Sequence, residues 1–386
     1  MVRRVAEKLI LIFFGIALPV MALVGVEIIL RIFPVLLPAP IRAAPKASLL
    51  DIFKRDPLRI ADSELVYRYR SKVVTTALNE DGEIVEYRTI SLGFPDVGFR
   101  DDGLDEEKEF RVVVLGDSFT QGGAVNLDDT WVEQLEQQTK ADLINLGVGG
   151  YGTVQERILL ERYGMKLEPD LVILALFTGN DFGDNGTYEG RVTKRVDERL
   201  KRFFGRYFYS YEMLKYMVGR SGGNPHLPKT EKLNDEELAY ESTELKLVFH
   251  IPHFFSLEKG DRFEWISKGA ELATENILRI QEMCDEREIE FLVLICPSKE
   301  QVYWDMVKTL LAEPERYDPD WPNSLIERLG TESGIHVLDL TPVFRAHSGD
   351  QIYFTEDTHW NVEGNRLAAE ATYNYLVENG LLPVNH

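Results

Sequence analysis

The sequence predicts an α/β protein with a parallel sheet covered by helices on both faces, preceded by one N-terminal transmembrane helix. Three observations lead to this prediction. Apolar runs rich in Val, Ile and Leu alternate with helical patterns from residue 110 onward, a capping box opens the first of these helices, and one long apolar run precedes them all. Near-continuous apolar strands between helices indicate a sheet that is buried on both faces.

The long apolar run covers residues 9–30 and contains one charged residue, Glu27. As a helix it would be about 33 Å long, which is enough to cross the hydrocarbon core of a bilayer. It is longer than the apolar core of a cleaved signal peptide, and no clear cleavage site follows it. We therefore predict a retained membrane anchor at residues 1–30, with Glu27 paired to Arg31. Positive charges nearly balance on its two sides, so they do not set its orientation.

Residues 31–60 are rich in Pro and Ala and are predicted to form a linker. The domain after it, residues 61–386, is predicted to open with short strands within 65–74 and 82–92, because these stretches alternate apolar and polar residues. Its main strands are predicted at 110–117, 141–147, 170–179, 289–298 and 336–342. Its helices are predicted after Thr130, which stands three residues before Glu133 as in a capping box, and at 154–163, 267–287, 323–333 and 362–378.

An insertion of helical character is predicted at about residues 185–265. Within it, residues 199–217 are basic and aromatic although the chain as a whole is acidic. Aromatic residues recur there at helical spacing, which is typical of a packed face. We predict a lid over the functional site; the alternative is a face that lies against the membrane.

Composition excludes several classes of function. The formal net charge of −21 argues against a general nucleic-acid-binding protein, since phosphate contacts need an excess of Lys and Arg. The two cysteines, Cys284 and Cys296, have no metal-ligand spacing and are too few for a disulfide scaffold, so we predict two buried free thiols. The pair of histidines at 250–253 lacks a third ligand and is not predicted to bind a metal.

Gly-rich segments suggest three known motifs, and the sequence fits none of the three. The stretch "GDSFTQGG" from residue 116 lacks the Lys-Ser/Thr of a phosphate-binding loop, and Thr120 stands where a G-x-S-x-G elbow needs Gly. The stretch "NLGVGGYG" from residue 145 matches a dinucleotide fingerprint, but no acidic residue ends the following strand. What remains is Ser118, a candidate nucleophile that directly follows a strand.

Two other candidates also follow predicted strands. Asn180, in "FTGND", is either a turn residue or a side-chain donor to an oxyanion. His359 lies just before Asn361, which is predicted to cap the last helix, and so is free to point into the crevice. Ligands of α/β sheets sit at the carboxyl ends of the strands, where all three residues fall.

Four segments, in order, resemble the blocks of the SGNH (GDSL-type) hydrolases: "GDS" (116–118), "NLGVGGYGT" (145–153), "TGND" (178–181) and "DTHWN" (357–361). The segment "VLICPSKEQVY" (293–303) and the "DTHW" block also resemble the alginate O-acetylation branch. The resemblance spans about 110–375 and implies a flavodoxin-like three-layer α/β/α sandwich. It also implies Ser118 as nucleophile, His359 as base, and Gly150 and Asn180 as oxyanion donors beside the Ser118 N–H.

The acid of the predicted triad departs from the usual D-x-x-H block, because Glu356 stands three residues before His359. Asp357 stands two before it, as in the D-x-H of the acetylation branch. In an extended stretch, residues i and i+2 project to the same side, which favours Asp357; a tight turn would favour Glu356. We predict Asp357, because the cap at Asn361 leaves an extended approach to the helix.

The resulting prediction is a serine esterase that acts on acyl esters, in particular O-acetyl esters, with cell-envelope carbohydrate as the expected substrate. It needs no metal or organic cofactor. An O-acetyltransferase acting on an exported polysaccharide would share every site residue, and a catalytically idle glycan- or lipid-binding protein is the alternative from another class. The resemblance implies a single-pass cell-membrane protein whose catalytic domain is periplasmic or extracellular.

Overall fold

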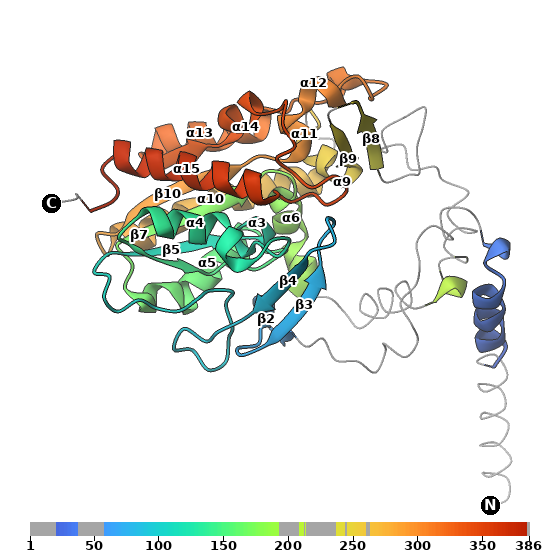
Figure 1. The fold of residues 1–386 in the computed structure, drawn as a ribbon, viewed down its shortest axis with the longest axis horizontal. Helices are drawn as coiled ribbons and strands as arrows, with labels where there is room; N and C mark the ends of the chain where they lie inside the picture. Colours follow the sequence, from blue (N-terminus) through green and yellow to red (C-terminus); the bar gives the residue numbers. More distant parts are fainter. Residues whose placement is uncertain are drawn as a thin grey trace, which may run out of the picture. The chain divides into compact units, whose positions relative to one another are not determined.

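The computed structural model describes residues 21–37, 58–192, 208–211, 213, 237–243, 245–259 and 263–383. The chain forms two compact units, one from Met1–Arg55 with Lys194–Leu227 and the other from Asp56–Thr193 with Pro228–His386. The second unit contains the sheet and every candidate site residue (Figure 1).

The second unit is built on a five-stranded parallel sheet in the order β11-β10-β7-β5-β6. Its strands are β5 (Arg111–Gly116), β6 (Asp142–Asn145), β7 (Leu171–Phe177), β10 (Glu290–Cys296) and β11 (His336–Asp339). The strand that comes first in the sequence therefore lies between the second and the third, which is the flavodoxin-like order. The prediction of an α/β fold with a parallel sheet is confirmed. Each strand ends before its predicted end, because the chain turns there into the loops that carry the site.

Helices cover both faces of this sheet. Side chains alternate along a strand, so Val112 and Val114 of β5 belong to one buried cluster, and Val113 and Leu115 belong to the other. The first cluster includes residues of α4 (Trp131–Gln138), α14 (Thr341–Ala346) and α15 (Val362–Glu378). The second includes residues of α5 (Thr153–Arg162), α10 (Glu264–Asp285) and α13 (Trp321–Ser333). The architecture thus has three layers (Figure 1).

The predicted capping box at the start of α4 is formed only in part. Thr130 Oγ1 accepts a hydrogen bond from Glu133 N at 3.4 Å, as a cap should. The backbone N–H of Thr130, however, donates to Leu127 O, so it is not available to the Glu133 side chain. The carboxylate of Glu133 turns instead toward other acidic residues, which are considered below. The cap of the last helix forms as predicted, with Asn361 Oδ1 accepting from Gly364 N at 3.0 Å.

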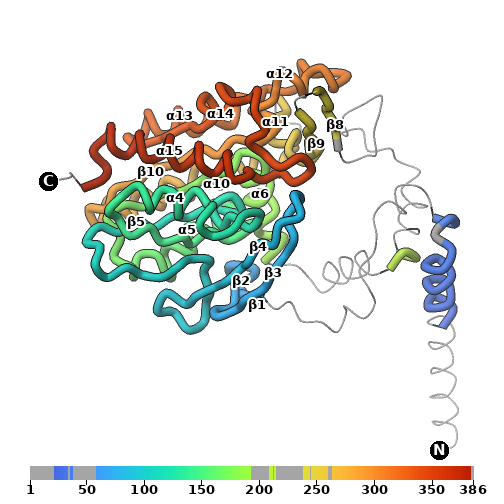
Figure 2. Tube along the Cα trace, in the orientation of Figure 1, coloured from blue at the N-terminus to red at the C-terminus, as the bar shows by residue number. Residues whose placement is uncertain are grey.

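Three antiparallel hairpins accompany the main sheet: β1 (Arg59–Asp62) with β2 (Val66–Tyr69), β3 (Val74–Leu78) with β4 (Ile84–Arg88), and β8 (Glu237–Glu241) with β9 (Lys246–His250). Strands β2 and β4 lie within the segments predicted to be strands. The third hairpin falls inside the predicted helical insertion, so residues 237–241 and 246–250 of that insertion form strands and not a helix. Figures 1 and 2 show the first two hairpins next to each other at the amino-terminal part of this unit.

The N-terminal unit is described in two short pieces. Residues 21–32 are helical, and Glu27 Oε1 pairs with Arg31 Nε at 2.9 Å, as predicted. The same carboxylate accepts the backbone N–H groups of Tyr209 (3.1 Å) and Ser210 (2.9 Å), so part of the aromatic stretch 199–217 contacts this helix. Among the residues that the structure describes, no helix is both long and apolar enough to cross a membrane. Residues 1–20 of the predicted anchor lie outside the described residues.

Candidate active site

The candidate nucleophile Ser118 begins a short helix, α3 (Ser118–Gln121), directly after β5. Asp117 caps this helix, since its Oδ1 accepts from Phe119 N at 2.8 Å. The preceding residue must be glycine: Gly116 has φ +155°, and a Cβ there would lie 2.2 Å from Thr120 Oγ1. The G-D-S sequence therefore has a local physical cause, which is to fold the chain from strand into helix within two residues. Ser118 is thereby held at the carboxyl end of β5.

His359 and Asp357 come from the loop between α14 and α15. An isolated bridge pairs Tyr353 with Trp360, and Phe354 N donates to His359 O at 3.1 Å, so the loop is closed at its base. The residues between are a succession of bends and not the extended approach that the cap at Asn361 had suggested.

The loop brings both residues to Ser118. His359 Nε2 lies 2.7 Å from Ser118 Oγ, and His359 Nδ1 lies 2.5 Å from Asp357 Oδ1. The same Asp357 oxygen accepts His359 N at 2.9 Å, so the bend itself aims the carboxylate at the ring. Glu356 is exposed, and its recorded hydrogen bonds are made by its backbone. Asp357 is thus the carboxylate that contacts the imidazole, although the stretch is bent.

The electrostatics of Asp357 favour its charged form. Partial burial on its own would raise the pKa of this carboxyl, but the hydrogen bond and charge of His359, with a smaller effect of Lys299, lower it to about 2. An ionised Asp357 accepts the Nδ1 proton and leaves Nε2 of the ring free to accept the proton of Ser118. Asp117 differs: burial raises its pKa, although the Phe119 N–H and His359 act in the opposite direction.

Two charged residues that the sequence analysis did not select hold the loop that carries Asp357. Glu80, between β3 and β4, accepts three consecutive backbone N–H groups, those of Thr355 (2.7 Å), Glu356 (2.7 Å) and Asp357 (2.8 Å). Lys299, which is fully buried after β10, donates to the carbonyl oxygens of the same loop at Phe354 (2.7 Å), Thr355 (3.1 Å) and Asp357 (2.7 Å). The anionic Glu80 therefore binds backbone N–H groups of this loop, and the cationic Lys299 binds its backbone carbonyl groups.

The candidate oxyanion donors lie after the strands next to β5. Gly150 follows β6 with φ +77°, a conformation that favours glycine, and its N–H donates to no acceptor among the described residues. Its neighbour Gly149 approaches the nucleophile, since a Cβ there would lie 3.4 Å from Ser118 Cβ. Asn180 follows β7, and its side-chain Oδ1 is buried without a partner among the described residues. The ring of Phe177, at the end of β7, stacks on Phe119 with 4.0 Å between ring centroids. No contact between Asn180 and Ser118 is recorded.

The remaining histidine and cysteine candidates of the sequence analysis have structural roles. His253 Nδ1 lies 3.0 Å from a carboxylate oxygen of Glu300, and this contact explains part of the pair at 250–253 without a metal. Burial would raise the pKa of Glu300, but the charge and hydrogen bond of His253 lower it to about 2. Cys284 and Cys296 are both free and buried, as predicted.

Two known protein families match the ranges of the chain that contain Ser118, Gly150, Asn180, Asp357 and His359. Residues 114–224 match the GDSL-like Lipase/Acylhydrolase family, and residues 265–382 match the family described as SGNH hydrolase-like domain, acetyltransferase AlgX. Two family models of SGNH-type or GDSL-type hydrolases therefore match separate ranges of this chain. The predicted resemblance to the SGNH (GDSL-type) hydrolases and to their alginate O-acetylation branch is confirmed. The prediction that the protein is an enzyme acting on ester bonds, as a hydrolase or an acyltransferase, is also confirmed.

Several solved structures are similar to this chain. An acetyl xylan esterase is 14% identical, with 69% of this chain and 98% of that chain covered and a TM-score of 0.38. A GDSL-like lipase from Bacteroides thetaiotaomicron is 13% identical, with 72% and 92% covered and a TM-score of 0.36. A catalytic mutant of an acetylxylan esterase from Geobacillus stearothermophilus is 10% identical, with 70% and 94% covered and a TM-score of 0.37. No curated protein matches the chain.

The contacts of Glu80 with the loop that carries Asp357 lead to a first expected result. In Glu80→Gln, one carboxylate oxygen becomes an NH2 group, which cannot accept the backbone N–H groups of the loop. A hydrogen bond to a charged group contributes about 1.5–3 kcal/mol, and Glu80 is exposed, so we expect kcat for a small acetyl ester to fall about tenfold. KM should change little, because Glu80 acts through Asp357 and His359 and not on the substrate. Steady-state kinetics measures both constants.

The matched control is Glu83→Gln. Glu83 lies on the same hairpin, is exposed and loses the same charge, but its recorded contacts are with Asn79 and not with the loop. Equal kcat values for the two variants would show that Glu80 does not position Asp357.

Proposed function

We propose that the chain is a serine esterase that cleaves acyl esters, in particular O-acetyl esters, through Ser118, His359 and Asp357. The observation that carries the proposal is the unbroken line of hydrogen-bond contacts from Ser118 Oγ through both ring nitrogens of His359 to Asp357. A nucleophile, a base and an orienting carboxylate in this order are the arrangement that activates a serine for acyl transfer.

The proposed chemistry has two halves. In the first, His359 Nε2 takes the Ser118 proton as Oγ attacks the ester carbonyl, and then gives that proton to the departing alcohol as the ester C–O bond breaks. In the second, His359 takes a proton from water, whose oxygen attacks the acyl-enzyme, and returns it to Ser118 Oγ as the carboxylic acid leaves. Asp357 keeps a proton on Nδ1 throughout and stabilises the imidazolium that forms in each half.

The negative oxygen that develops in each half requires donors. Ser118 is the first residue of α3, so its N–H has no acceptor within the helix. The N–H of Gly150 is likewise not used by the described residues, and we propose Asn180 as the third donor, through its side-chain amide. Removing one donor from such a site costs about 3 kcal/mol of transition-state stabilisation in other hydrolases.

The size of the cavity beside Ser118 supports a short acyl group. This cavity has a volume of about 10 Å³ and is lined by Ser118, Phe119, Gly122, Ala124, Val125, His359, Trp360 and Asn365. That is about the least space that holds one water molecule, so we propose that the cavity accepts no acyl group larger than acetyl. A longer acyl chain would have to displace buried side chains such as Val125 and Trp360.

We therefore expect a marked preference for acetyl over butyryl esters. Each methylene that a pocket cannot accept changes kcat/KM by about 10–200-fold, so the acetyl ester should be favoured at least about tenfold. The measurement compares p-nitrophenyl acetate with p-nitrophenyl butyrate on the purified full-length protein. Val125→Ala, which removes two methyl groups from the cavity wall, should lower the ratio of kcat/KM for the acetyl ester to kcat/KM for the butyryl ester. Equal kcat/KM for both esters in the wild type would contradict the assignment of this cavity to the acyl group.

An O-acetyltransferase is the second candidate function, and the match of residues 265–382 to an acetyltransferase family favours it. It differs only in the second half-reaction, where a sugar hydroxyl replaces water. Incubation with an acetyl ester and a polysaccharide acceptor distinguishes the two, because an esterase releases acetate while a transferase acetylates the acceptor at the expense of acetate release.

We also propose that the protein is held in the cell membrane by its N-terminal apolar segment, with the catalytic domain on the periplasmic or extracellular side. The apolar run at residues 9–30 supports this proposal. Protease accessibility of the catalytic domain in intact spheroplasts tests it, since protection from added protease would contradict an external domain.

A further inference from the structure

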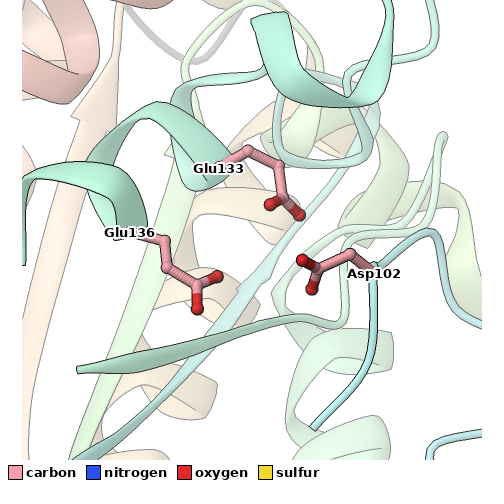
Figure 3. Close-up of side chains that lie close together, drawn as sticks. All are labelled: Asp102, Glu133 and Glu136. Atoms are coloured by element: carbon pink, nitrogen blue, oxygen red, sulfur yellow. The ribbon is translucent and has the colours of Figure 1, made fainter. Parts of the chain in front are cut away.

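A cluster of three carboxylates lies apart from Ser118 and His359, between the loop after Phe99 and helix α4. Glu133 and Glu136 are one helical turn apart and so lie on the same face of α4, while Asp102 approaches from the loop (Figure 3). One carboxylate oxygen of each residue lies within 4.8 Å of those of the other two. Figure 3 shows the carboxylates of Glu133 and Asp102 directed toward each other, with that of Glu136 beside them.

Two carboxylate oxygens of this cluster, one from Glu133 and one from Glu136, are buried without a hydrogen-bond partner among the described residues. Glu133 is only 6% exposed, and its Oε1 has no hydrogen-bond partner among the described residues. Glu136 pairs through Oε1 with Lys108, but its Oε2 is also buried and without a partner there. A buried carboxylate oxygen that lacks a donor is costly, and a proton or a cation must compensate it.

The surrounding charges do not neutralise the cluster. Arg100 is buried nearby, but its terminal NH groups donate to backbone carbonyls, including those of Gln121 (3.1 Å) and Val125 (2.7 Å). Asp101, also buried, adds a further acidic group and accepts backbone N–H groups of Gly103 and Asn145. Acidic groups therefore outnumber the cations that contact them.

We propose that Asp102, Glu133 and Glu136 bind one divalent cation, Ca²⁺ in preference to Mg²⁺. The donors are all carboxylate oxygens, which hard cations prefer, and no histidine or cysteine joins the cluster to favour zinc. Ca²⁺ accepts six to eight oxygen ligands in irregular geometry, including bidentate carboxylates, with water completing the shell. Mg²⁺ requires a near-ideal octahedron, which two glutamates one turn apart and a loop aspartate are not built to supply.

The bound ion would connect the 99–103 loop to the start of α4. This connection bears on the catalytic centre, because Arg100 in the same loop holds the carbonyls that follow α3. Asp101 accepts Asn145 N at 2.7 Å, and Asn145 Nδ2 in turn donates to Thr120 O in α3 at 2.7 Å. The ion is thus expected to stabilise the protein and, through Asp101 and Asn145, to hold α3 in place, without contacting the substrate.

Calcium binding is tested on the full-length protein after treatment with chelator and removal of the chelator. We expect isothermal titration calorimetry to give one Ca²⁺ per chain, and Tm to rise by several degrees on addition of Ca²⁺ but less with equimolar Mg²⁺. Asp102→Asn and Glu133→Gln should each weaken the Kd for Ca²⁺ at least tenfold. Glu106→Gln is the matched control, since this exposed residue of the same loop region loses the same charge outside the cluster, and it should bind as the wild type does.

Two outcomes would overturn the proposal. One is a wild-type protein that shows neither heat of binding nor a rise in Tm with Ca²⁺. Burial, and then the charges of Asp102 and Asp101, raise the pKa of Glu133 to about 8, so a proton could take the place of the ion. Stability would then fall as the pH rises from about 5 to 8, with no effect of Ca²⁺. The other is a Kd for Ca²⁺ that is equal in Asp102→Asn and in the wild type. Asp102 is exposed, so the substitution should leave the fold intact.

Discussion

Ser118→Ala is expected to lower kcat/KM for acetyl ester hydrolysis by about 10⁴–10⁶-fold, the loss that follows removal of the nucleophile in other serine hydrolases. No other hydroxyl group of the described residues contacts His359, whose Nε2 lies 2.7 Å from Ser118 Oγ. The fold should survive, because Ser118 is not fully buried and its side-chain hydrogen bonds are those to His359 and Asp117. Hydrolysis of p-nitrophenyl acetate measures activity, and circular dichroism measures the fold.

Ser348→Ala is the control for this result. Ser348 is part-exposed and follows α14, away from the contacts of the candidate site, so its substitution should leave kcat/KM near the wild-type value. His359→Ala should match Ser118→Ala, since the two residues act as one unit and their effects are not additive. Wild-type turnover by purified Ser118→Ala would exclude the serine mechanism.

Asp357→Asn is expected to lower kcat/KM by about 10⁴-fold, as substitution of the orienting aspartate does in serine proteases. An amide at this position can donate to Nδ1, which favours the ring tautomer that cannot accept the Ser118 proton. The carboxylate accepts both the ring and the backbone N–H of His359, so the amide also disturbs the bend. Steady-state kinetics of Asp357→Asn at several pH values measures kcat/KM, and Glu356→Gln is measured in parallel.

Glu356→Gln should leave kcat/KM near the wild-type value, because the exposed Glu356 holds its place through backbone hydrogen bonds that the substitution keeps. The two variants remove the same charge from adjacent residues and differ only in contact with the imidazole. The reverse ranking would assign the role to Glu356, in line with the usual D-x-x-H spacing of the family.

The main sheet could be predicted from the sequence because each central strand is a run of Val, Ile and Leu that both faces bury. All seven residues of β7 are buried, so the run has no polar alternation to obscure it. The strand of residues 74–78 was not predicted beyond its first residue, since all five of its residues are exposed and its pattern resembles that of a loop. Strands β8 and β9 form a hairpin inside the insertion at about 185–265, which was predicted to be helical from the aromatic spacing of another part of it, residues 199–217.

The candidate site could be predicted in part, because each of its residues directly follows a strand or precedes a helix cap. The choice of Asp357 rested on an extended loop, whereas the contact with His359 arises in a bend. That bend is imposed by Glu80, which lies 275 residues before Thr355 in the sequence, and by Lys299 after β10. No local pattern can indicate such a contact. A lysine directly after a buried strand, in "PSKEQ", was the one available signal.

Labelling with a serine-directed fluorophosphonate tests the central claim most directly, because the reagent reacts only with a serine that a base has activated. The full-length protein is treated with the reagent, and the adduct is located by mass spectrometry of its peptides. We expect one adduct per chain, on Ser118, that is absent in Ser118→Ala and strongly slowed in His359→Ala. A folded wild-type protein that remains unlabelled, or an adduct on a serine other than Ser118, would contradict the assignment of Ser118 as an activated nucleophile.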